Sequence, residues 1–318
     1  MKTNRELLGM PEGRGLSLAV ISIALLAAGG ILLYTVNQLS SEMPQAAAAA
    51  LPASTIDLMS AAQKGDVNAI DAALKAGAKP DQLVDTSGGR SGMTALMVAC
   101  ASGKTDAVKA LLKGGASPNA RAADGKTALM YAAGWGNPAT VQALLDANAR
   151  VNDRSEDGMT ALMLAAVRGD MTSLAAIRNA GADVAARNKW GQTALMNAAV
   201  AGDAAKIESL LSAGAIANDQ DRDGKSPLLL AAESDHGVEA VKALLKAHAD
   251  PNVADSEGAT PLMKASLKGD AEMVTALLTA GASVTQKDKG GMTALDWAAN
   301  RTDAQGDAVK SILTQAKK

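Results

Sequence analysis

Methionine is the residue type whose spacing in this chain first suggests chemistry. Six methionines occupy the same place in a repeated sequence, and four of them follow one another at intervals of 33 residues. Thioether sulfurs are soft ligands that suit copper(I), and they are also open to oxidation. The pattern therefore allows a methionine-based redox or metal-handling protein. The residues are Met59, Met97, Met130, Met163, Met196 and Met263.

Geometry argues against a shared metal site on these methionines. Equivalent positions on stacked helices lie about 8–10 Å apart, whereas metal–sulfur bonds are about 2.3 Å long. Neighbouring methionines could not both reach one ion without distortion. Methionine also fills irregular gaps in a core well. We therefore expect the methionines to pack the core, and we predict neither a metal nor a cofactor.

The remaining reactive side chains form no recognisable catalytic or metal-binding arrangement. The chain has two histidines, His236 and His248, and one cysteine, Cys100. The histidines lack the spacing of a zinc motif, and a lone cysteine excludes an internal disulfide and a CxxC zinc site. Cys100 stands where other copies of the repeat have alanine, so it is expected to be a buried filler. No phosphate-binding loop or nucleophile elbow is present. We predict no catalytic residue and no enzyme activity.

The amino-acid composition limits both the kind of core and the class of partner that we expect. The 318 residues are 48% apolar but only 2% aromatic, with no phenylalanine, so the core must consist of thin layers of small and aliphatic side chains. Lys and Arg number 31 against 33 Asp and Glu. This balance argues against nucleic acid as a partner, because binding it needs a basic face.

Short helices repeated along the chain must position all of these residues. The stretch "TALMVAC" at 94–100 returns at steps of 33 or 34 residues, up to "TALDWAA" at 293. Each copy opens with Thr or Ser, which cap helix N-termini, and Pro227 and Pro261 then suit the first helical position. A glycine such as Gly136 ends the helix about nine residues after the cap.

A second helix follows in each copy. Asp or Asn supplies its cap, as at Asn137, and apolar residues then recur at helical spacing, with Leu211 expected in the core. Glycine ends this helix in the left-handed conformation. Asn148 and His248 replace that glycine in two copies, and both residue types tolerate positive φ.

The stretch "DGKTALMYAAGWGNPATVQALLDANARVN" resembles an ankyrin repeat, and the resemblance covers about residues 55–318. It implies an all-α ankyrin-repeat solenoid of about eight helix–turn–helix units, which needs stacked neighbours to bury its apolar faces. The family often has Pro-Leu-His where this chain has Ala-Leu-Met. Because the family histidine makes hydrogen bonds, we expect packing to replace some of them here. The predicted units are 55–86, 87–121, 122–154, 155–187, 188–220, 221–254, 255–287 and 288–318.

The first 54 residues differ from the rest. Residues 16–36 carry no charge and would form a helix about 31 Å long, enough to cross a bilayer. We predict a cytoplasmic tail at 1–15, a transmembrane helix at 16–36 and an Ala/Pro linker at 37–54. Basic residues precede the span and none follows it before Lys64, which places the repeats on the far side. We expect a single-pass protein of a bacterial inner membrane with periplasmic repeats. Cleavage of the segment as a signal peptide, giving a soluble periplasmic form, is the alternative.

The resemblance also implies a function. Ankyrin stacks bind other proteins through a concave face lined by loop tips and first helices, so we expect a non-enzymatic scaffold with a protein partner of unknown identity. No nucleic acid and no small-molecule substrate are expected. Three of the five aromatic residues fall on this face, where aromatics and Arg form interface hot spots. The alternative is that Tyr131 packs between repeats and Trp135 covers its neighbours, while Trp297 seals the last unit. The predicted contact residues are Tyr131, Trp135, Leu164, Val167, Arg168 and Trp190.

Overall fold

The computed structural model describes residues 53–84 and 92–317. The predicted tail, the predicted anchor and all but the end of the predicted linker lie outside these residues. The first described helix begins at Ala53, two residues before the predicted start of the repeats. Among the described residues, no helix has both the length and the apolar character needed to cross a membrane.

The described residues form eight pairs of helices, one pair for each copy of the repeat. The described residues form no strand, only isolated bridges between Val84 and Met93 and between Arg121 and Thr127. The first helices are α2 (Ala53–Lys64), α4 (Ala95–Ala101), α6 (Ala128–Trp135), α8 (Ala161–Val167), α10 (Ala194–Ala201), α12 (Pro227–Glu233), α14 (Pro261–Lys268) and α16 (Ala294–Ala299). The second helices are α3 (Val67–Lys75), α5 (Thr105–Lys113), α7 (Pro138–Asp146), α9 (Met171–Asn179), α11 (Ala204–Ser212), α13 (Val238–Lys246), α15 (Ala271–Thr279) and α17 (Ala304–Ala316).

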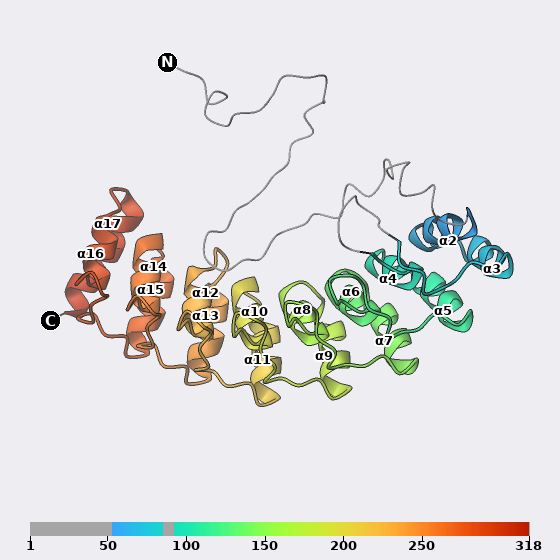
Figure 1. Cartoon of the computed structure of the whole chain (residues 1–318). Helices are drawn as coiled ribbons and strands as arrows, with labels where there is room; N and C mark the ends of the chain where they lie inside the picture. Colours follow the sequence, from blue (N-terminus) through green and yellow to red (C-terminus); the bar gives the residue numbers. More distant parts are fainter. Residues whose placement is uncertain (1–52, 85–91, 318) are drawn as a thin grey trace, which may run out of the picture. The chain divides into compact units, whose positions relative to one another are not determined.

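The helix pairs stack in the order of the sequence. Each first helix packs against the first helices of the neighbouring units and against the second helix of its own unit, and the second helices form a parallel row (Figure 1). Contacts between adjacent units thus build one continuous core from pairs that could not bury their apolar faces alone. This arrangement confirms the predicted all-α repeat architecture.

The predicted caps are present at nearly every helix start. Thr94 accepts the backbone N–H of Met97 at 3.3 Å, and Asp170 accepts that of Ser173 at 2.9 Å. Among the Thr and Ser caps of the first helices, Thr127 is the exception, because its buried hydroxyl has no partner among the described residues. Lys104 and Gly237 precede α5 and α13 without a side-chain cap. At the ends of the second helices, Asn148 and His248 adopt φ values of 62° and 60°. Both therefore replace glycine in the left-handed conformation, as predicted.

The repeated methionines are buried, and they also contribute hydrogen bonds. Their exposed fractions range from 0% to 6%. The backbone N–H of Thr94 points at the sulfur of Met97 at 3.4 Å, and Thr260 does the same with Met263 at 3.4 Å. Methionine at the position of the family's histidine therefore packs in the core and also accepts a hydrogen bond at the start of its own helix. Here the thioether closes a capping box with the threonine that starts the helix.

Polar ladders join successive units on the side of the loops. Asn119 accepts the N–H of Arg150 at 2.7 Å, and Asn252 accepts that of Ser283 at 2.8 Å. Arg121 donates to the carbonyl oxygen of Arg154 at 2.7 Å, and Arg187 repeats the contact on Gln220 at 2.8 Å. These bonds fix each loop to the next and so hold the loop tips in register.

The core consists of small and aliphatic residues, as the composition predicts. One assignment within it was wrong by one position. Leu210 in α11 is fully buried, whereas Leu211 is only partly buried at the edge of the core. The pattern of two consecutive leucines could not tell which of them faces the neighbouring helices.

Candidate functional site

Tyr131 and Trp135 lie four residues apart on α6, so both project from the same face of that helix. Their ring centroids are 6.1 Å apart and the ring planes are tilted by 37°. This separation and tilt lie within the range that aromatic pairs favour. We call Tyr131, Trp135, Leu164, Val167 and Arg168 the aromatic patch.

Arg168 joins the pair from the next unit. It directly follows α8 as the C-cap residue, and its guanidinium lies 5.1 Å from the centre of the Trp135 ring. Gly169 allows this approach, because a Cβ there would clash with the carbonyl oxygen of Ala133 in α6. Contacts of this kind stabilise a cation on an aromatic face by about 0.5–1 kcal/mol at exposed sites.

Burial differs sharply within the aromatic patch. Tyr131 is 8% exposed and Leu164 is 6% exposed, so both mainly pack between units. Burial, reinforced by the charge of Asp124, raises the pKa of Tyr131 well above its usual value. Trp135, Val167 and Arg168 are half-buried and form most of the accessible surface of the patch. The indole N–H of Trp135 has no hydrogen-bond partner among the described residues.

Trp190 occupies a loop tip. Its backbone N–H donates to Asn188 at 2.9 Å, and its carbonyl oxygen accepts the N–H of Arg222 at 3.0 Å. The ammonium of Lys189, which also pairs with Asp157, lies 4.8 Å from the ring centre. The ring contacts of the described residues link Tyr131 to Trp135 and do not extend to Trp190. The predicted contact residues therefore form two groups, the aromatic patch and the Trp190 tip.

A second group of polar side chains lies on the first helices of the last three units and in the loops that precede them, and sequence reasoning missed it. Glu233 accepts from Lys225 at 2.9 Å and from Lys264 at 2.8 Å, and Lys264 also approaches Asp255 at 3.8 Å. We call these residues, together with Trp297, the ion-pair cluster. Lys264 and Trp297 occupy the repeat position of Tyr131, so an alignment of the units could have brought them together.

Trp297 does more than cover the end of the stack. Its indole N–H donates to Asp288 at 2.7 Å, and Lys264 of the preceding unit lies 5.4 Å from its ring centre. The hydrogen bonds from the Met292 N–H and from Trp297 lower the pKa of Asp288 below its usual value. The contact with Lys264 joins the final unit to its neighbour, and the hydrogen bond to Asp288 holds the indole within its own unit.

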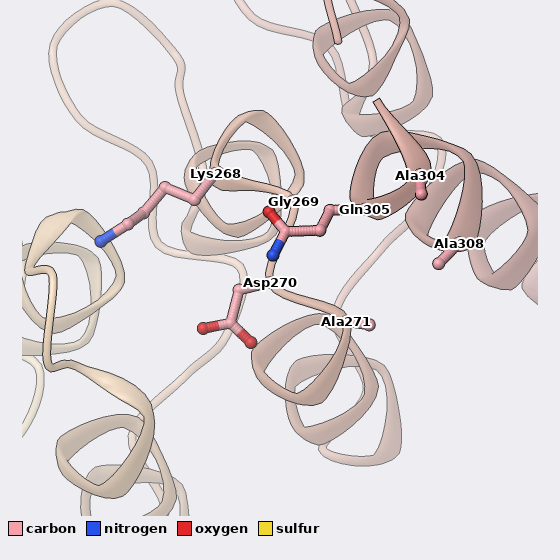
Figure 2. A pocket seen from close by; sticks show the side chains of 7 residues that line it. All are labelled: Lys268, Gly269, Asp270, Ala271, Ala304, Gln305 and Ala308. Atoms are coloured by element: carbon pink, nitrogen blue, oxygen red, sulfur yellow. The ribbon is translucent and has the colours of Figure 1, made fainter. Parts of the chain in front are cut away.

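An open hollow of about 490 Å³ lies between the last two units (Figure 2). Its polar side chains already make hydrogen bonds within the protein. Asp270 accepts the N–H of Met273 at 2.9 Å, and Gln305 accepts from Arg301 at 3.2 Å. The ammonium of Lys268 points away from the hollow, toward the preceding unit. The arrangement favours packing between units over recognition of a ligand.

The reactive residues considered from the sequence have structural positions. Cys100 is fully buried, and burial raises the pKa of its thiol well above the usual value. His236 is an exposed turn residue. Within residues 53–84 and 92–317, no group of three or more His, Cys, Asp or Glu side chains could hold a metal ion.

Comparison with known proteins agrees with the fold. The family model described as "Ankyrin repeats (3 copies)" matches residues 58–155, 162–255 and 234–318. A search of curated proteins finds no match to this chain. Ankyrin repeats are generally protein–protein interaction modules, and proteins built from them are generally non-enzymatic scaffolds. With nearly all of its repeats matched, the chain belongs to the ankyrin-repeat family.

Proposed function

We propose that this protein is a non-enzymatic scaffold that binds another protein through the aromatic patch and the Trp190 tip. The observation that carries the proposal is the half-buried Trp135 with the Arg168 guanidinium over its ring. Trp and Arg are enriched among the residues that dominate binding energy at interfaces. Both lie on the row of first helices, at positions that change from one unit to the next and do not form the common core.

Site-specific photo-crosslinking in intact cells tests this assignment. A photoreactive amino acid is placed at Trp135, at Trp190 and, as a control on the second helices, at Lys242. We expect a defined cross-linked species from the first two positions and none from the third. Cross-links that form only from Lys242 would place the binding surface on the other row of helices.

We further propose that residues 16–36 anchor the scaffold in a bacterial inner membrane, with the repeats in the periplasm. The support is the uncharged span and the basic residues that precede it. A reporter that is active only in the periplasm, fused after Lys318, should be active. Arg5→Glu with Arg14→Glu should weaken that orientation. Activity of a cytoplasm-only reporter at the same fusion point would reverse the proposed topology.

Cleavage of the anchor would give a soluble periplasmic scaffold instead. Intact-mass analysis of the protein from the membrane fraction and from the soluble periplasmic fraction distinguishes the two forms. We expect the full-length mass in the membrane fraction. A shortened mass confined to the soluble fraction would show that the segment is removed.

A further inference from the structure

Two arginines adjoin the tryptophans of the proposed binding surface, and their side chains have no hydrogen bond or ion pair with a described residue. They are Arg168 and Arg222. Every other described arginine donates its guanidinium to a carbonyl or carboxylate oxygen. These other arginines are Arg121, Arg150, Arg154, Arg178, Arg187 and Arg301.

Each open arginine belongs to the unit that follows its tryptophan. The guanidinium of Arg168 lies 5.1 Å from the centre of the Trp135 ring. The backbone N–H of Arg222 donates to Trp190 at 3.0 Å, and its Cγ would lie 3.3 Å from a Cβ placed on Gly191. The polypeptide thus places one unused guanidinium over the half-buried indole of Trp135, and a second on the residue whose backbone is hydrogen-bonded to that of the half-buried Trp190.

The lysines in this part of the stack differ from the two arginines, because their ammonium groups are already paired. Every lysine from Lys126 to Lys268 has a carboxylate partner within the protein. Glu156 and Asp223 add exposed carboxylates at the loop tips. The surface is therefore not broadly basic, and a polyanion would find few free cations on it. Two separate guanidinium groups remain, and each can bind one carboxylate through two parallel hydrogen bonds.

We infer that the partner presents an acidic segment, with one carboxylate for Arg168, another for Arg222 and an apolar side chain against Trp135. The inference rests on the proposed function of this surface. Arg168 and Arg222 lie two units apart, which corresponds to at least about 16 Å at the usual spacing of packed helices. An extended chain rises about 3.3 Å per residue, so the two acidic residues are separated by about five residues or more.

Selection from a library of random 12-residue peptides, using the full-length protein in detergent, tests the inference without knowledge of the partner. We expect the enriched peptides to contain two separated Asp or Glu residues and an apolar residue. In a synthetic copy of the best peptide, Asp→Asn or Glu→Gln at either position should weaken binding at least tenfold, because charge-assisted hydrogen bonds are lost. Arg168→Gln with Arg222→Gln should weaken binding at least as much and should make it insensitive to those peptide changes.

Two variants separate the inference from the proposed function. Trp135→Leu with Trp190→Leu removes the indoles, and Lys242→Gln with Lys246→Gln removes two cations from the second helices. Peptides that depend on the tryptophans but keep their affinity without carboxylates would overturn the inference and leave the proposed function standing. Peptides that bind the tryptophan variant at full strength would contradict both. A library that yields no enriched sequence would also overturn the inference, because a short acidic segment is all that it requires.

Discussion

The aromatic patch and the ion-pair cluster use the same repeat positions for different purposes. In the units around α6 and α8, Tyr131 and Trp135 meet Arg168, whose guanidinium has no carboxylate partner among the described residues. In the units around α12 and α14, Lys264 stands at the position of Tyr131 and is paired with Glu233. In the aromatic patch, the Arg168 guanidinium can still donate hydrogen bonds to another protein. In the ion-pair cluster, the charged side chains pair with one another.

The comparison shows which parts of a repeat the fold requires. Buried core positions recur in both regions, and Thr160 and Thr260 each close the first turn of a helix. The residue after the repeated methionine varies in type, as Tyr131, Asn197 and Lys264 show, and it is buried in some units and half-buried in others. The same variable positions can therefore hold residues proposed for binding or residues that stabilise the stack. The two groups differ in whether their charged side chains have a partner within the protein.

The largest expected effect concerns stability along the stack. Leu210 is fully buried in α11, and Leu210→Ala should lower the free energy of unfolding by about 2–5 kcal/mol through lost burial and a residual cavity. Leu313 in α17 is 2% exposed but lies in the last unit. Leu313→Ala should act mainly on that unit, because each repeat contacts only its neighbours. Urea unfolding combined with hydrogen exchange measures both effects, and equal loss of protection across all units in both variants would contradict this picture.

A smaller effect is expected when the ion-pair cluster is broken. Glu233→Gln leaves Lys225, which is 8% exposed, and Lys264 without their shared carboxylate, and should cost about 1–3 kcal/mol of stability. Glu208→Gln is the control, because its pair with Lys246 is exposed and should contribute less than about 0.5 kcal/mol. Thermal melts of the two variants give the comparison.

The Glu233→Gln variant also tests whether the ion-pair cluster, unlike the aromatic patch, has no part in binding. Glu233→Gln should leave capture of the partner unchanged, since the proposed binding surface lies around α6, α8 and the Trp190 tip. Loss of capture without loss of folding would show that the ion-pair cluster takes part in binding. The proposed division between a binding surface and a structural cluster would then be wrong.

The smallest expected effect is a pH response confined to the last unit. The hydrogen bond from Arg301, supported by the Gly306 N–H, lowers the pKa of Asp303 to about 2, against about 3.9 in an unfolded chain. The contribution of Asp303 is therefore fully present above about pH 4 and is lost as the pH falls through about 2. A carbon-detected NMR titration should show this low pKa, and Asp303→Asn should remove the corresponding loss of order at the start of α17.

The control for this titration lies one helical turn further along. Asp307 pairs with Lys310 at the surface, so Asp307→Asn should leave the titration of Asp303 unchanged. A pKa of Asp303 near its ordinary value would show that the contact with Arg301 does not persist in solution.

Much of the fold could be predicted because its signals are local and repeated. Caps such as Asp170 and left-handed residues such as Asn148 depend on a few neighbouring positions, and each copy of the repeat restates them. Contacts between units were harder to predict. The hydrogen bond of Arg121 to the next unit joins residues that are distant in sequence, and so does the ion pair of Glu233 with Lys264.

The candidate site was predicted less completely than the fold. Position in the repeat indicated that Tyr131, Trp135 and Arg168 lie near one another, and the ring contacts agree. Their role in binding stays a prediction. Position in the repeat could not show that Tyr131 and Leu164 are more than nine-tenths buried, since burial depends on how closely adjacent units approach. Nor could it show that Arg168 and Arg222 differ from the other described arginines, because that depends on the partners that each side chain reaches.

The most direct test of the central claim is capture of the native partner by a tryptophan variant. Full-length protein carrying Trp135→Ala and Trp190→Ala is compared with the wild type and with Lys242→Ala plus Lys246→Ala, by mild cross-linking in intact cells and co-purification. Melting curves confirm that all three proteins are folded. Each tryptophan should contribute about 2 kcal/mol or more to binding, so the first variant should lose its partner while the lysine variant retains it. A tryptophan variant that melts normally and captures the partner at full strength would contradict the proposed binding surface.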